Sequence, residues 1–346
     1  LVTAMLCGTN IGHETAPKMA GNSNTIPSGS IGSFAACAAI QTTVQSLVPV
    51  IGINRNAVPM PYGAATGSPS PAGVPDANSM INLFSSSASK LMARLADQGN
   101  AKLYEEYYKA FLGLVKTVDR ATYQRAYEDS RVAISLVSQN LGSVLAPAPG
   151  QVDAWCGPAA IDANVKALAN NLIVTANAFK LGLTPHVTFG GFFDDPHGAF
   201  AGQPDDLFDG LGRSLESFQA FLDTVPDPVV SGKFLGDRLV MTMSGDTIKN
   251  PHQRSGWPDG APGGANLLYV QGAGKLPGGF FGDIMQNARM NWDPVTGALS
   301  ATTPTAACTS AACGAVLYAV TGGSTDDVRQ YYSAPLGNII IKPGTT

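Results

Sequence analysis

Short apolar runs alternate along the chain with longer stretches in which apolar residues recur at helical spacing. Apolar runs of about four to eight residues bounded by glycine or proline predict buried strands, and recurrence every three to four residues predicts helices. The predicted strands lie at 1–6, 48–53, 186–189, 238–243 and 266–270, and the predicted helices outside residues 78–146 lie at 33–48, 161–181 and 205–224. Strand, glycine-rich loop and helix in repeated order predict an α/β fold, in which helices flank a central, mostly parallel sheet.

Helical spacing dominates the segment from about 78 to 146. Apolar residues recur every three to four positions from Met80 to Leu95, and the same spacing continues from Ala101 to Val118 and from Ala121 to Leu145. An aromatic stripe within this segment is interpreted as helix–helix packing; it comprises Tyr104, Tyr107, Tyr108 and Phe111. The sequence shows no internal repeat, so residues 1–346 are expected to form one α/β domain that carries this mainly helical insertion.

The amino-acid composition excludes several classes of protein. Charged residues make up 13% of the chain and hydrophobic residues 45%, with 39 glycines and 24 prolines. This hydrophobic content excludes a chain that is disordered because of high charge and low hydropathy. The 21 basic against 25 acidic residues leave no excess positive charge for nucleic acid, and no apolar run reaches the length that a membrane span needs. A weakly charged globular protein, rich in glycine and proline loops, remains.

The five cysteines suggest disulfides. Cys308 and Cys313 are separated by four residues, with no further cysteine or histidine nearby, which predicts a small disulfide-closed loop rather than a metal site. Cys7 and Cys37 flank a loop rich in glycine, serine and asparagine, where a second bridge and two free thiols fit the sequence equally well. Cys156 is interpreted as a buried thiol.

Export is predicted from the start of the chain together with the cysteines. The chain begins at Leu1 on an apolar strand and not at methionine, which indicates that an upstream segment, such as an export signal, has been removed. Disulfides are typical of oxidising compartments. We therefore expect a periplasmic, cell-surface or extracellular protein.

Several motifs at the ends of the predicted strands resemble one known family. They are Gly191-Phe-Phe-Asp-Asp-Pro-His197, the strands at 238–244 and 266–272, Lys275-Leu-Pro-Gly-Gly-Phe-Phe-Gly282, and the first strand and loop, Leu6-Cys-Gly-Thr-Asn-Ile-Gly12. The family is the exported domain-of-unknown-function family 1501, related in fold to the alkaline phosphatase and sulfatase superfamily. The resemblance covers nearly the whole chain and is best over 186–282. It implies a central mixed sheet between helices, and export, for which we expect the twin-arginine (Tat) route.

The resemblance also implies a site at the carboxyl ends of the strands, where ligands bind in sheets of this kind. The related enzymes hold metal ions with aspartate and histidine and attack phosphate or sulfate esters with a serine, threonine or cysteine. Asp195 and His197 keep the family's aspartate–histidine spacing, and Asp246 stands where the family has a Ser-Glu-Phe-Gly-Arg turn. The candidate ligands for one divalent ion (zinc, calcium or manganese) are Asp194, Asp195, His197, Asp246 and His252, and the candidate nucleophile is Ser244.

Two positions depart from the family pattern. Asn10 or Ile11 occupies the place of an aspartate near the end of the first strand, and Asp259-Gly-Ala-Pro replaces the family's Asp-His-Gly, so that its histidine is lost. The expected protein is therefore catalytically degenerate and acts as a structural, binding or assembly component, through self-assembly or contact with other cell-surface proteins. The alternative is a metal-dependent phosphoric or sulfuric ester hydrolase with an atypical site, and the sequence leaves open whether the protein is an enzyme.

Three further features of the sequence can each be interpreted in two ways. Asp205, Asp206 and Asp209 fit either the N-terminus of a helix or a calcium site. The Gly272-Ala-Gly274 segment is either a simple turn or a weak phosphate-loop signal. The tryptophans fit either stacking platforms for a surface polymer or local hydrophobic anchors; they are Trp155, Trp257 and Trp292. By contrast, His186 begins a predicted strand and is expected to be structural.

Overall fold

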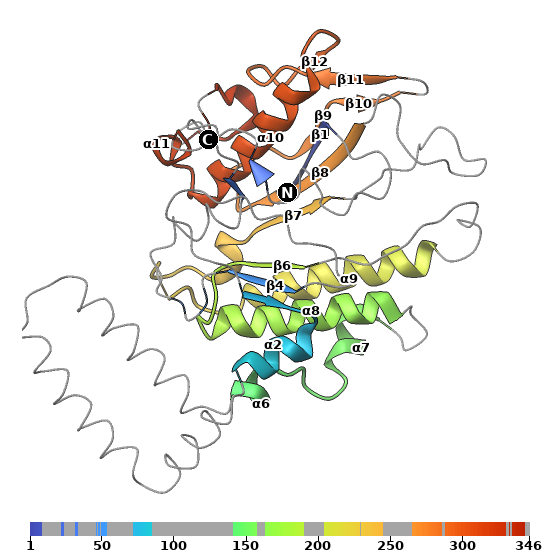
Figure 1. Cartoon of the computed structure of the whole chain (residues 1–346), viewed down its shortest axis with the longest axis vertical. Coiled ribbons are helices and arrows are strands. Elements are labelled where there is room, and N and C mark those ends of the chain that lie inside the picture. Colours follow the sequence, from blue (N-terminus) through green and yellow to red (C-terminus); the bar gives the residue numbers. More distant parts are fainter. Residues whose placement is uncertain are drawn as a thin grey trace, which may run out of the picture.

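The structure of the protein is a computed structural model that describes residues 1–8, 22–23, 32–33, 46, 48, 50–53, 72–84, 141–157, 163–189, 204–228, 230–244, 265–285, 288–329, 332 and 334–342. Within these residues the fold is mixed α/β (Figure 1). A four-stranded sheet combines the first strand of the chain with strands from its C-terminal third, and a separate three-stranded sheet lies with the middle helices. The α/β class predicted from the sequence is confirmed.

The four-stranded sheet, sheet A, is mixed in direction. Its order is β7 (Val240–Ser244), β8 (Ala265–Gly272), β1 (Val2–Gly8) and β9 (Gly279–Phe281). β8 runs antiparallel to both of its neighbours, whereas β1, β7 and β9 run in the same direction. The sequence between β7 and β8 is rich in glycine and proline and has no helical spacing, so it does not predict the helix that usually makes a parallel crossover. The prediction of one central, mostly parallel sheet is too simple for this sheet.

One helix, α10 (Thr305–Val320), covers one face of sheet A and packs chiefly on β1. Its sequence is apolar or small on all sides, which is typical of a helix that is buried all round. The core that this helix forms with sheet A includes Met5, Leu6, Cys7, Leu268, Val270, Trp292, Cys308, Cys313, Val316 and Tyr318. The first strand and the C-terminal helix are therefore parts of the same core.

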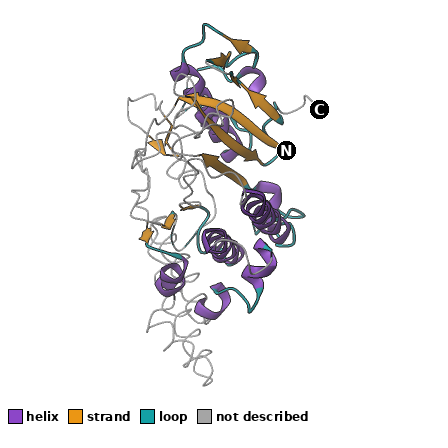
Figure 2. Cartoon of the chain, turned by 90° about the vertical axis from the view of Figure 1, so that its right-hand side faces the viewer, coloured by secondary structure: helices purple, strands orange, loops and turns teal. Residues whose placement is uncertain are grey.

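A second helical layer packs near the start of β7. It consists of α7 (Gln151–Cys156), α8 (Ala163–Lys180) and α9 (Pro204–Leu222), and Figure 2 shows α8 and α9 side by side, nearly end-on. Leu239 and Met241 pack into the core of this layer, and Gln271 of β8 donates a hydrogen bond to Gln219 of α9. The bounds of α8 and α9 agree with the helices predicted at 161–181 and 205–224.

The small three-stranded sheet is parallel. Its order is β5 (Ala72–Val74), β4 (Ile51–Ile53) and β6 (Val187–Phe189), and it shares a core with α8, α2 (Ala77–Phe84) and α6 (Leu141–Leu145). Helices α2 and α6 contact each other. They bracket residues 85–140, which hold most of the predicted helical insertion and its aromatic stripe and lie outside the described residues.

The C-terminal part adds a small antiparallel sheet and short helices. The sheet consists of β10 (Asp283–Ile284), β11 (Arg289–Trp292) and β12 (Leu299–Ser300), and the short helices are α11 (Thr325–Val328) and η3 (Gly337–Ile339). Elsewhere in the chain, the remaining elements are β2 (Asn22–Ser23), β3 (Gly32–Ser33) and η1 (Leu235–Arg238). The backbone amide of Asn338 in η3 donates to the carbonyl of Val295 at 2.8 Å, and its side-chain amide donates to the carbonyl of Thr296 at 3.2 Å. These bonds hold the C-terminal segment on the turn between β11 and β12.

Candidate functional site

Two strands of sheet A end at the edge where the sequence predicts a site. Gly8, the last residue of β1, pairs with Ala265, and Ser244, the last residue of β7, pairs with Leu268 in the same half of β8. Because β1 and β7 run in the same direction, their carboxyl ends lie on the same side of the sheet. This side is the β1–β7 edge. The last residues of the two strands there are Leu6, Cys7, Gly8, Met243 and Ser244.

Of the predicted nucleophile and metal ligands, the structure describes only Ser244, at the β1–β7 edge. The five predicted ligands are outside the described residues, and their convergence stays a prediction; they are Asp194, Asp195, His197, Asp246 and His252. Among the residues that the structure describes, no three histidine, cysteine, aspartate or glutamate side chains are grouped so that they could hold a metal ion.

The glycine-containing turn after β8 lies at the opposite end of sheet A. Gln271 pairs with Val2, so the segment that follows it leaves the sheet away from the β1–β7 edge. Ala273 and Gly274 have φ angles of 50° and 72°, and the amide of Lys275 donates to the carbonyl of Gly272 at 2.8 Å. Two successive positive φ angles are characteristic of a type I′ turn. The chain reversal accounts for the glycines, and this strand end does not belong to the predicted site.

The predicted disulfide between Cys308 and Cys313 is wrong. Both residues belong to α10, five positions apart, so their Cα atoms are separated by about 7.5 Å along the helix axis, which is more than a disulfide spans. The described cysteines are buried thiols, and none of them is in a disulfide; they are Cys7, Cys156, Cys308 and Cys313. The prediction of a buried thiol at Cys156 is confirmed. Cys37, the predicted partner of Cys7, lies outside the described residues.

Helix α9 accounts for the aspartates that follow Pro204. The helix begins at Pro204, so Asp205 and Asp206 lie in its first turn, where negative charge is favourable near the free backbone amides and the positive end of the helix dipole. Asp209 accepts a hydrogen bond from Nε of Arg213 at 2.6 Å, one turn further along the helix. These observations favour the helix N-terminus over the calcium site.

Two of the three tryptophans are core residues. Trp292 is fully buried, and its Nε1 donates to the carbonyl of Leu6 at 2.8 Å. Trp155 is 9% exposed, and its ring centroid lies 6.0 Å from that of Phe221. Neither ring is available as a stacking platform for a polymer, so the interpretation as hydrophobic anchors is confirmed for both. Trp257 lies outside the described residues.

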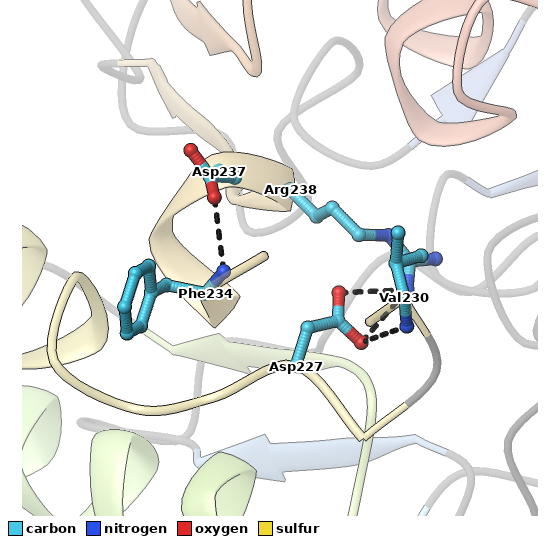
Figure 3. A network of polar contacts seen from close by, with 5 residues as sticks. All are labelled: Asp227, Val230, Phe234, Asp237 and Arg238. Atoms are coloured by element: carbon cyan, nitrogen blue, oxygen red, sulfur yellow. Dashed lines mark hydrogen bonds and ion pairs between the residues drawn. The ribbon is translucent and has the colours of Figure 1, made fainter. Parts of the chain in front are cut away.

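A buried carboxylate that the sequence did not reveal lies ahead of β7. The side chain of Asp227 is 1% exposed, and Nη1 of Arg238 donates to its two oxygens at 3.1 and 3.3 Å (Figure 3). The amide of Val230 donates to the same carboxylate at 3.2 Å. The contacts stabilise the loop before β7, at the end of that strand away from the β1–β7 edge, so we interpret them as structural. No local pattern marks the pair, because the fold brings the two side chains together.

The placement of His186 fits the structural role predicted for it. It lies immediately before β6, and its carbonyl accepts hydrogen bonds from the amide of Ile51 at 3.0 Å and from the hydroxyl of Thr184 at 2.9 Å. Burial lowers the pKa of its imidazole from 6.5 to about 4. The ring is therefore neutral at pH 7.

We expect His186 to make stability depend on pH. The unfolded chain binds a proton at this ring below about pH 6.5, whereas the folded chain binds it only near pH 4, so the free energy of unfolding decreases as the pH falls between these values. For a half-buried ring the loss is about 1–3 kcal/mol. Urea denaturation of the wild type and of His186→Gln at pH 7 and pH 4.5 measures it. The stability difference between the two proteins should shift in favour of the variant at pH 4.5, and an unchanged difference would contradict the prediction.

Comparison with known proteins identifies no relative. No protein-family model matches the chain, and no curated protein and no solved structure is significantly similar to it. The resemblance to family 1501 rests on the sequence motifs alone and stays a prediction. Among the described residues, no helix is both long and apolar enough to cross a membrane.

Proposed function

We propose that the protein is an exported, catalytically degenerate relative of the alkaline phosphatases and sulfatases, which acts outside the cytoplasm as a structural, binding or assembly component. One observation carries the proposal: the last residues of β1 and β7 at the β1–β7 edge include Ser244 and no aspartate, glutamate or histidine. In the related enzymes, aspartate and histidine at such strand ends hold the metal. The sequence beyond β1 adds Asn10 and Ile11, which are poor ligands for a divalent ion.

The architecture supports the fold part of this proposal. Three strands of sheet A share one direction, and helices pack on the sheet from two sides, α10 on one face and α9 near β7. In open α/β sheets ligands bind at the carboxyl ends of parallel strands, and β1 and β7 run in the same direction although β8 lies antiparallel between them. The β1–β7 edge is therefore the place where an ancestral metal site would have been.

An exposed edge strand supports the assembly part. β9 is the last strand of sheet A, and Phe280 within it is 75% exposed. Edge strands offer backbone groups for pairing with another chain, and an exposed aromatic side chain adds apolar area to such a contact. Since only 13% of the residues are charged, long-range repulsion between copies is weak.

Metal analysis and native mass test the proposal on natively purified protein. We expect no stoichiometric zinc, calcium or manganese, no hydrolysis of aryl phosphate or sulfate esters, and a native mass above the 35.7 kDa of one chain. Phe280→Asp should lower the native mass, whereas Phe208→Asp, at an exposed position of α9, should not. A dispersed wild-type monomer would count against assembly. Export is tested separately, by comparing the intact mass of the native protein with that of the full gene product.

The position of Ser244 is the observation that favours the alternative, a metal-dependent ester hydrolase. Ser244 ends β7 on the same side of the sheet as the end of β1, and the resembled enzymes place reacting groups at such strand ends. If the alternative holds, the purified protein contains a divalent ion and cleaves phosphate or sulfate esters, and His197→Ala abolishes both. Hydrolysis that survives both His197→Ala and Ser244→Ala would come from a contaminant.

A further inference from the structure

The outer side of β9 is open among the described residues. The described strands pair with β9 only through β1, and Gly279 and Phe280 are both exposed. A Cβ atom at Gly279 would meet nothing within 4 Å, so no other part of the chain crowds this residue. The turn between β11 and β12 does approach β9, but its Gly297 lies against Phe281, which packs on the core between sheet A and α10. The backbone at Gly279 and Phe280 is therefore accessible to another strand.

Sheet A has no charged residue that would keep another strand away from this edge. The sequences of β1, β7, β8 and β9 contain no aspartate, glutamate, lysine, arginine or histidine. Edge strands are commonly protected from pairing with other chains by a charge or a proline, and β9 has neither within its three residues. This edge is therefore suited to pairing with another strand.

Exposed apolar side chains surround β9. Of the eleven large apolar side chains that are exposed among the described residues, five lie on β9 or beside it. Leu1 lies against Gly278, just before the strand, and Gly297, between two of the others, lies against Phe281. We call β9 and these five side chains the β9 surface; they are Leu1, Val2, Phe280, Val295 and Leu299. Contiguous exposed apolar surface of this kind is typical of a protein–protein contact.

Two opposite charges flank β9 and indicate which chain would pair with it. Lys275 lies four residues before the strand and Asp283 two residues after it, and the sequence from 265 to 288 has no other charged residue. When two copies of one strand pair antiparallel, the segment before one strand lies beside the segment after the other. The Lys275 end of each copy would therefore meet the Asp283 end of the other, whereas parallel pairing would bring like charges together. The flanks of β9 are thus complementary in charge to those of an antiparallel second copy.

We propose that two copies of the chain pair through β9 in antiparallel order about a two-fold axis at Phe280, so that sheet A continues from one copy into the other. The pairing rests on the assembly role proposed above and specifies its partner, a second copy of this chain. Phe280 then lies opposite Phe280 of the second copy, where a cross-strand aromatic pair stabilises the contact. Because the same surface is used on both copies, the contact is closed and joins two chains.

Cross-linking of the full-length variant Phe280→Cys tests the position of the two-fold axis. Side chains directly opposite each other in an antiparallel pair have Cβ atoms about 4.5–5.5 Å apart, close to the separation in a disulfide. After mild oxidation by copper–phenanthroline in air, we expect a covalent dimer of twice 35.7 kDa on a non-reducing gel. The matched control is Phe208→Cys, at an exposed position of α9, which should stay monomeric on the gel. So should the wild type, whose described cysteines are buried.

Charge reversal tests the antiparallel order. Lys275→Asp and Asp283→Lys each place like charges beside each other at both ends of the paired strands, and each should weaken dimerisation by about fivefold or more at low ionic strength. The double variant Lys275→Asp/Asp283→Lys restores opposite charges and should return to within about twofold of the wild type. Sedimentation equilibrium measures the dissociation constants. Rescue in the double variant would not occur if the two flanks belonged to separate contacts.

The outcomes separate this pairing from the assembly role on which it rests. A wild type that is monomeric at every concentration would overturn both. If the wild type is oligomeric but Phe280→Cys does not cross-link, or the double charge reversal does not restore dimerisation, the pairing through β9 is overturned and assembly uses another surface. Neither Lys275 nor Asp283 is a buried residue, and circular dichroism of each variant distinguishes a lost contact from a lost fold.

Discussion

Replacing Trp292 by alanine is expected to lower the free energy of unfolding by about 3–5 kcal/mol, the usual range for removal of a large core aromatic. The side chain is fully buried between sheet A and α10, and its ring centroid lies 5.6 Å from that of Phe281. The truncation removes this packing and the hydrogen bond to the carbonyl of Leu6 at 2.8 Å. Urea denaturation followed by far-UV circular dichroism measures the loss, because fluorescence would change with the tryptophan itself.

Trp292→Phe separates the two contributions. Phenylalanine keeps most of the apolar area and leaves the carbonyl of Leu6 without its donor, which costs about 1–3 kcal/mol. We therefore expect the midpoint of Trp292→Phe to lie between those of the wild type and Trp292→Ala. If both variants unfold at the wild-type midpoint, Trp292 is not part of the core described above.

Replacing Gly337 by alanine is expected to cost at least about 3 kcal/mol, since it combines an overpacked contact with backbone strain. A Cβ atom at this position would lie 1.8 Å from the carbonyl oxygen of Val295, and the residue has a φ angle of 41°. The same carbonyl accepts the amide of Asn338, so a shift that relieves the clash also weakens this hydrogen bond. The urea midpoint of the variant should fall well below that of the wild type.

Gly232→Ala is the matched control for this experiment. Gly232 has a φ angle of 77°, and a Cβ atom there would meet nothing within 4 Å. Its replacement therefore measures the cost of a left-handed backbone alone, about 1–2 kcal/mol. Equal effects of the two substitutions would show that η3 does not lie against the turn between β11 and β12.

Hydrophobic spacing was sufficient to predict the position of a helix with a clear apolar period and of a strand formed by a compact apolar run. β1 and β8 come from short apolar runs, and α9 has apolar residues on one face, so their positions could be read from local sequence. Spacing gave no indication of α10. Its residues are apolar or small on every side, so no period distinguishes it, and two cysteines within it suggested a closed loop instead.

The candidate site was harder to predict than the fold, because the pattern of apolar residues does not show in which direction a strand runs within its sheet. The sequence of residues 265–272 predicts a strand but not whether it runs parallel or antiparallel to its neighbours. Only the pairing with β1 and β7 shows that β8 is antiparallel. That direction moves Gln271 to the far end of the sheet and leaves Gly8 and Ser244 on one side. The ion pair of Asp227 and Arg238 was not predicted for a related reason, since its members are eleven residues apart, Asp227 in a loop and Arg238 at the end of η1.

The pairing of β1 has a consequence for the order of events during synthesis. Val2 pairs with Gln271, and Leu6 receives its hydrogen bond from Trp292, so the first strand finds its partners only in the last quarter of the chain. A nascent chain on the ribosome must keep Met5 and Leu6 away from other apolar surfaces until those partners have emerged. Contacts between such distant residues slow folding and prolong exposure to aggregation. Folding of this core therefore has to wait until the residues of β8, β11 and α10 have left the ribosome, and chaperones could bind Met5 and Leu6 during that interval.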